Sequence, residues 1–130
     1  MGDHNFAYKM VSDKSFEEVV GNINKLVPEH KFRVLAEHNV QQTLAEKGLE
    51  RGPLKIIEVC NAGFAHKATQ KDIDVALMMP CKYTVYEENG KTTVALMLPS
   101  VIAQMMPDVG LEELAGDVEM TLKTIMEASV

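Results

Sequence analysis

The chain has 130 residues, of which 46% are hydrophobic and 25% are charged, and its formal net charge is -6. A chain of this length buries enough apolar surface to fold as one domain, residues 1–130, without disulfides or a structural metal. The acidic charge argues against nucleic acid as a partner, because phosphate binding requires clustered positive charge.

Membrane insertion and secretion are also not indicated. No apolar run approaches the roughly 18 to 20 residues of a membrane-spanning helix, so we expect no membrane partner. The first residues, Met1 to His4, lack the basic and apolar regions of a secretory signal peptide. We therefore expect a cytoplasmic protein, in which the two cysteines would be reduced thiols.

The N-terminal part of the chain predicts a strand followed by a helix. Residues 5–11 alternate loosely between apolar and polar side chains, a pattern typical of a strand. Ser15 and Glu18 have the spacing of a capping box at a helix N-terminus. Apolar residues at helical spacing continue to Val27, and Pro28 is expected to end the helix.

The next segment predicts a strand with one side facing solvent. Phe32, Val34 and Ala36 alternate with polar residues, and His38 falls in register with this apolar side. A histidine at such a position is more often a core or edge residue than a catalyst. A short helix is expected over residues 40–47, because an asparagine precedes it and a glycine follows it.

A third strand is expected over residues 54–61, which are mostly apolar. Asn61 is a suitable N-cap for a following helix that contains residues 64–68, on which His66 is expected to face solvent. Residues 75–79 are apolar without a clear period, so the pattern assigns them to neither helix nor strand.

The most specific local signal is the pair Asn89-Gly90, which lies between two alternating segments and predicts a two-residue type I′ hairpin. Such a turn determines the strand register. The expected pairs are Glu88 with Lys91, Val85 with Val94, Tyr83 with Leu96 and Cys81 with Leu98. Cys81 is therefore expected to point toward a core.

The C-terminal part completes the predicted fold. Pro99 and Ser100 end the fifth strand, residues 101–106 suggest a short helical segment, and residues 111–126 present one apolar helix face. The order is a strand, a helix, four strands with short helical insertions, and a final helix. This order predicts one α+β domain, with helices packed on one face of a largely antiparallel sheet.

Three segments together resemble the domain-of-unknown-function 302 family: residues 55–61, residues 80–81 and residues 85–87. The resemblance covers nearly the whole chain. It implies a two-layer β-α-β4-α domain with a five-stranded sheet, similar in topology to TATA-binding-like folds, and it implies homodimers. It implies little about activity. This chain has Ala62 and Leu98 where family members often carry proline and a polar residue, respectively, and Leu98 makes that rim more apolar.

Candidate chemistry is concentrated at the ends of the third and fourth strands. Cys60 lies directly before a predicted helix N-terminus, which can activate a thiol, but Cys60 and Cys81 lack the spacing of a redox motif. Because free cysteines are commonly buried, packing is the favoured role for both. Glu58 alternates onto the same strand face as Cys60, so it is expected to line any cavity that Cys60 lines. It is the first candidate for a general acid or base.

A soft-metal or haem site is a further hypothesis, because several residues here are of ligand types. They are Cys60, Cys81, His38, His66, Met78 and Met79. None of them has the spacing of a zinc or haem attachment motif, so the sequence favours no metal and identifies no cofactor.

The leading hypothesis is a noncatalytic, homodimeric domain that binds a small molecule or a partner, with its pocket near the Cys60 and Cys81 strand ends. The expected ligand-binding residues are His38, Glu58, Cys60, Asn61 and Cys81. The alternative is a thiol-dependent, metal-dependent or haem-dependent redox protein or enzyme that uses Cys60 or Cys81, with Glu58 as the proton carrier.

Overall fold

The computed structural model describes residues 4–130. Met1 to Asp3, on which the expected absence of a signal peptide partly depended, lie outside the described residues. One sheet has the strand order β1-β5-β4-β3-β2, and every neighbouring pair is antiparallel. The strands are β1 (Ala7–Ser12), β2 (Arg33–Asn39), β3 (Leu54–Cys60), β4 (Cys81–Glu88) and β5 (Lys91–Met97). The predicted α+β class is confirmed.

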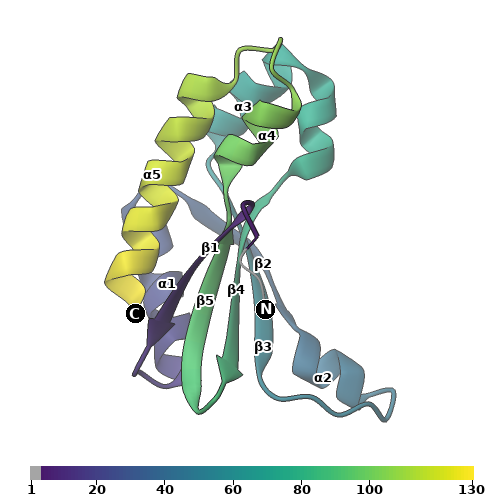
Figure 1. The fold of residues 1–130 in the computed structure, drawn as a ribbon, viewed down its shortest axis with the longest axis vertical. Coiled ribbons are helices and arrows are strands. Elements are labelled where there is room, and N and C mark those ends of the chain that lie inside the picture. The colour runs from purple at the N-terminus through teal and green to yellow at the C-terminus, as the bar shows by residue number, and fades with distance from the viewer. Residues whose placement is uncertain (1–3) are drawn as a thin grey trace.

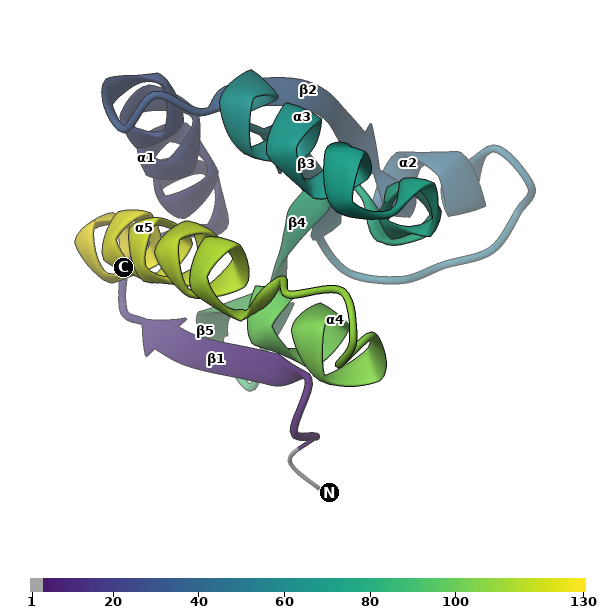
Figure 2. The same cartoon turned by 90° about the horizontal axis from the view of Figure 1, so that it is seen from above.

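The helices divide into three groups (Figures 1 and 2). The long helices α1 (Phe16–Glu29) and α5 (Glu112–Ser129) cover the concave face of the curved sheet. Beyond one end of the sheet lie α3 (Ala62–Lys71), the 3-10 helix η1 (Ile73–Met78) and α4 (Pro99–Met105), which we call the cap. The short helix α2 (Val40–Ala45) projects from the opposite, convex side. That convex side, which no long helix covers, is called the open face.

Local signals in the sequence account for most helix ends. The Ser15 Oγ accepts a hydrogen bond of 3.1 Å from the Glu18 N–H, as the capping box predicted. The expectation that Pro28 ends α1 is wrong by one residue, because Pro28 lies within the last turn and the helix ends at Glu29. A proline in a last turn removes a single backbone donor, so the turn still forms. Residues 75–79, unassigned from the pattern, fall mostly within η1.

The hairpin between β4 and β5 is the predicted type I′ turn. Asn89 and Gly90 both have positive φ angles, 55° and 76°. The expected pairs Glu88 with Lys91, Val85 with Val94, and Tyr83 with Leu96 are confirmed.

The fourth expected pair, Cys81 with Leu98, is not part of the ladder. The strand β5 ends at Met97, and the Leu98 N–H donates a hydrogen bond of 2.8 Å to the Phe6 carbonyl. Leu98 is instead the residue before α4. The chain leaves the sheet here because Pro99, at the first position of α4, has no N–H to continue the ladder.

A register shift in β2 changes the predicted position of His38. The shift lies between Val34, which pairs with Val59 on the core side, and Ala36, which pairs with Glu58. An extra residue in a strand moves all later side chains to the other face. The prediction that His38 shares a face with Val34 and Ala36 is therefore wrong for Val34. His38 lies with Ala36 on the open face.

The main core lies between the sheet and the helices α1 and α5. Its fully buried side chains are Val19, Ile23, Val27, Ile57, Val59, Tyr83, Val85, Val94, Leu96, Leu122, Ile125 and Met126. The Tyr83 hydroxyl donates a buried hydrogen bond of 2.6 Å to the Leu122 carbonyl, joining β4 to α5. A second, small cluster contains Val75 and Ala103 from the cap and Leu111 from the start of α5. Within residues 4–130, no helix combines the length and apolar character needed to cross a membrane.

Candidate functional site

A cavity of about 80 Å³ lies between the ends of β3 and β4 and the cap. The strands β3 and β4 contribute lining residues at its base, and α3, η1, α4 and the first half of α5 enclose it. The lining side chains are apolar or contain sulfur, with one exception in the part of the chain that the structure describes. That exception is Asn61, which alone among them has a side-chain oxygen or nitrogen.

Asn61 holds the cap against the body of the protein. Its Oδ1 accepts a hydrogen bond of 3.0 Å from the Phe64 N–H and so caps α3, as the sequence predicted. Its Nδ2 donates a bond of 2.8 Å to the Lys31 carbonyl, in the turn before β2. Because both ends of the amide are already bonded, Asn61 positions the cavity wall.

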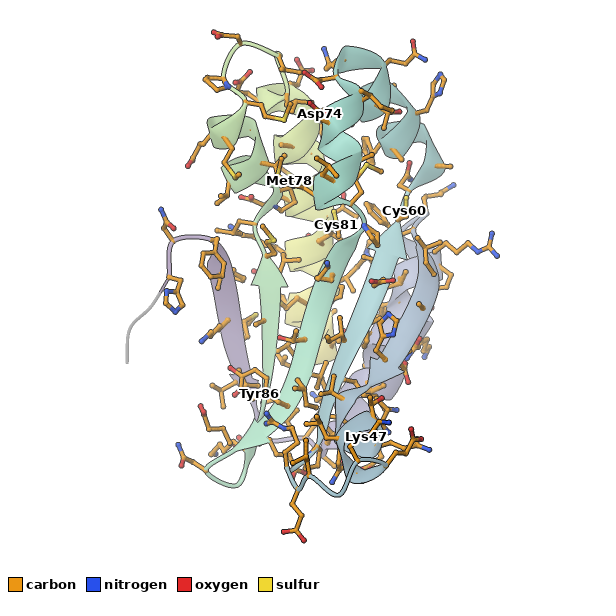
Figure 3. The ribbon with its side chains drawn as sticks, turned by 90° about the vertical axis from the view of Figure 1, so that its right-hand side faces the viewer. Lys47, Cys60, Asp74, Met78, Cys81 and Tyr86 are labelled. Atoms are coloured by element: carbon orange, nitrogen blue, oxygen red, sulfur yellow. The ribbon has the colours of Figure 1, made fainter. Side chains whose placement is uncertain are left out.

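Both cysteines line the cavity, and both are free thiols (Figure 3). Burial and, to a smaller extent, the neighbouring Cys60 raise the pKa of the Cys81 thiol, Lys82 lowers it, and the net result is a pKa of about 11. Burial also raises the pKa of Cys60. Both thiols are therefore protonated at neutral pH. The activation that a nucleophilic cysteine needs is a lowered pKa, the opposite of what this environment produces.

Glu58 and His38 lie together, but away from the cavity. The His38 Nε2 and the Glu58 Oε1 are 3.5 Å apart on the open face. The expectation that Glu58 lines the same cavity as Cys60 is wrong, since Glu58 is not among the lining residues. Glu58 alternates away from the buried side chains of Ile57 and Val59, whereas Cys60 ends the strand where the chain enters the cap.

The remaining candidate from the sequence, His66, is exposed on α3 and does not line the cavity. The five expected ligand-binding residues thus form two groups: Cys60, Asn61 and Cys81 at the cavity, and His38 and Glu58 on the open face. Across residues 4–130, no group of three or more histidine, cysteine, aspartate or glutamate side chains is placed to hold a metal ion.

Sequence reasoning missed the contribution of α4 and α5 to the site. Ala103 from α4, and Leu114, Ala115 and Val118 from α5, line the cavity. The apolar face predicted for residues 111–126 could have indicated that α5 contributes, because the first half of this face extends beyond the main core. Periodicity predicts that such a face packs against other elements, but it does not predict whether the packing leaves a cavity.

Comparison with known proteins places this fold in a family. The domain of unknown function DUF302 matches residues 8–129. The chain belongs to the DUF302 family. The resemblance found in the sequence is therefore confirmed over nearly the whole chain. No protein with curated annotation matches the sequence.

A solved DUF302 structure has the same fold. The crystal structure of the uncharacterized conserved protein DUF302 from Bacillus stearothermophilus is similar to this chain with a TM-score of 0.92 and 30% sequence identity. The similarity covers 98% of this chain and 100% of that chain. The DUF302 description names no activity, so function has to be argued from the site itself.

Proposed function

We propose that this DUF302 protein is a noncatalytic domain that binds a small apolar molecule in the cavity at the ends of β3 and β4. The observation that carries the proposal is the cavity of about 80 Å³ with its almost wholly apolar lining. An apolar cavity of about 150 Å³ admits benzene, and this cavity is about half that size. The class of ligand that suits it is therefore an apolar molecule smaller than benzene, or the end of an apolar chain.

An apolar ligand in this cavity would gain contacts with a lining that is almost wholly apolar. Because such a ligand binds only the folded state, it would raise the melting temperature.

Native mass spectrometry of freshly purified protein, followed by melting-shift measurements with a metabolite panel, tests the proposal. We expect a retained ligand or a shift with small apolar compounds. Ala103, which is buried in the cavity wall, allows a specific check. Ala103→Leu should fill the space and abolish the shift, whereas Ala128→Leu, at an exposed position on α5, should retain it. A bare protein with no shift across the panel would exclude this function.

The noncatalytic part of the proposal is supported by the protonated thiols. Iodoacetamide labelling at increasing pH should be slow at neutral pH and accelerate toward alkaline pH. We expect Cys60 to react before Cys81, because Cys81 also packs against the main core. A thiol that reacts rapidly at pH 7 would instead favour the thiol-dependent enzyme.

The proposal includes a homodimer formed through the open face of the sheet. The family resemblance implies homodimers, and this face has no long helix over it (Figure 2). It includes exposed apolar side chains, among them Val11 at 61% and Met97 at 37% exposure. A second copy presenting the same face would cover them in an isologous contact.

Light scattering at several protein concentrations tests the dimer. We expect the wild type to be dimeric at micromolar concentration, and Val11→Glu to shift it toward monomer. Leu77→Glu makes the same kind of change at an 83% exposed position on η1, away from the sheet, and should leave the dimer intact. A wild type that remains monomeric, or dissociation by Leu77→Glu alone, would contradict this surface.

A further inference from the structure

Four sulfur-containing residues line the same cavity. Two are the cysteines Cys60 and Cys81, and two are the methionines Met78 and Met79. Three of the four residues come from the short passage in which η1 ends and β4 begins, and Cys60 ends the neighbouring strand β3. Figure 3 shows Cys60 and Cys81 at this end of the sheet and Met78 above them, in the cap.

The residues that line the cavity offer soft sulfur ligands to a metal ion and few ligands of any other kind. Within residues 4–130, no histidine, aspartate or glutamate lines the cavity, and Asn61 is the only lining residue whose side chain carries an oxygen. The Asn61 amide is occupied by its two hydrogen bonds. Hard cations such as Mg²⁺ and Ca²⁺ require several oxygen ligands, so this cavity does not suit them.

The same lining narrows the choice among soft metals. Structural zinc sites need four cysteine or histidine ligands, and iron–sulfur clusters are commonly held by four cysteines. The whole chain has two cysteines. Cu(I) is matched by a set of thiolates and thioethers, because it is soft and carries a single charge.

We propose that the cavity binds one Cu(I) ion through the sulfurs of Cys60 and Cys81, with the thioethers of Met78 and Met79 as neutral donors. Each cysteine that binds releases its thiol proton to solvent, and copper remains in the +1 state without electron transfer. Two thiolates and one Cu(I) carry one net negative charge, and Lys82, next to Cys81 on β4, lies close enough to act on that sulfur.

The copper site rests on the cavity of the proposed function but not on its apolar ligand, so the two proposals can fail separately. A melting shift with apolar compounds tests the apolar-ligand proposal without metal. Copper uptake tests the copper site without an organic ligand. If both occupants bind, they should compete for the same space.

Anaerobic titration of the reduced full chain with Cu(I), in competition with a chromogenic Cu(I) chelator, tests the site. We expect one Cu(I) per chain and a thiolate-to-copper absorption band in the ultraviolet. Cys60→Ser and Cys81→Ser should each weaken binding at least 100-fold, and the double variant Met78→Leu/Met79→Leu about tenfold. Zn²⁺ at the same concentration should not displace the copper.

The control is the double variant Met105→Leu/Met120→Leu, which removes two exposed thioethers outside the cavity and should bind as the wild type does. Circular dichroism verifies the fold of each variant. Cys81 packs against the main core and Cys60 does not, so Cys60→Ser remains informative if Cys81→Ser fails to fold. Absence of uptake, or uptake unchanged in Cys60→Ser, overturns the site. Unchanged affinity in Met78→Leu/Met79→Leu overturns the proposed donor set.

Discussion

The two hydrophobic regions of this protein are packed differently. Between the sheet and the helices α1 and α5, large aliphatic and aromatic side chains are fully buried. The second buried cluster consists of Val75 and Ala103 in the cap and Leu111 at the start of α5, and the cavity lies beside it. The first region therefore buries many more large apolar side chains than the second, and the cavity lies beside the second.

Side-chain size explains the difference. The positions of α3, α4 and α5 that line the cavity include four alanines, namely Ala65, Ala68, Ala103 and Ala115. The corresponding layer of the main core has Ile23, Leu122, Ile125 and Met126. Helices approach a sheet to a distance that their largest side chains permit, so small side chains between them leave space.

The largest expected difference in stability is between the alanine variants of two leucines on α5. Leu122 is fully buried in the main core, whereas Leu114 is part-buried at the cavity. Leu122→Ala should lower the free energy of unfolding by about 3 to 4 kcal/mol, and Leu114→Ala by roughly half as much, since its surroundings are already loose. Urea denaturation measures both. Equal losses would show that the cap is packed as tightly as the core.

A second contrast concerns alkaline pH. Because burial raises the pKa of Cys81 to about 11 in the folded protein, the neutral thiol is favoured by folding. The unfolded thiol has its ordinary pKa of 9.0. The stability that the neutral Cys81 thiol contributes is therefore fully present below pH 9, and it is lost as the pH rises toward 11.

Unfolding experiments from pH 8 to pH 11 measure this loss. Over this range the free energy of unfolding of the wild type should fall by about 2 kcal/mol more than that of Cys81→Ala. The packing that Cys81→Ala removes costs the same free energy at every pH. Parallel curves for the two proteins would show that Cys81 titrates as an exposed thiol.

Asn61 tests how the cap is attached. Asn61→Ala removes both the cap of α3 and the bond to Lys31, so it should cost about 1 to 2 kcal/mol. Hydrogen exchange should show loss of protection concentrated in α3. Asn39→Ala removes the cap of the projecting α2 and serves as the control, with a smaller loss confined to that helix. Loss of protection throughout the main core would mean that the two regions unfold together.

Tyr83 gives the smallest expected effect. Tyr83→Phe removes only the hydroxyl that donates to Leu122, and it should lower the stability by about 1 kcal/mol. Tyr86→Phe, on the open face of the same strand, should change the stability little. Thermal or urea unfolding of the two variants distinguishes them. A larger loss for Tyr86→Phe would indicate that the open face is the more tightly held side.

The sequence predicted much of the fold because the relevant signals are local. The capping serine, the N-cap Asn61 and the Asn89-Gly90 turn each act within a few residues, and each has the predicted geometry. Of the five residues predicted to bind a ligand, Cys60, Asn61 and Cys81 line one cavity, whereas Glu58 and His38 lie on the other side of the sheet. Their binding roles stay predictions.

Spacing and turn chemistry predict most of the order of elements, the hairpin register and the direction of Cys81 toward the core, because these signals act over a few residues. The bulge in β2, which moves His38 to the open face, appears only in the folded structure, because a bulge depends on the neighbouring strand. The cavity beside Cys60 and Cys81 likewise depends on the sizes of side chains from six separate helices and strands, which no local pattern reports.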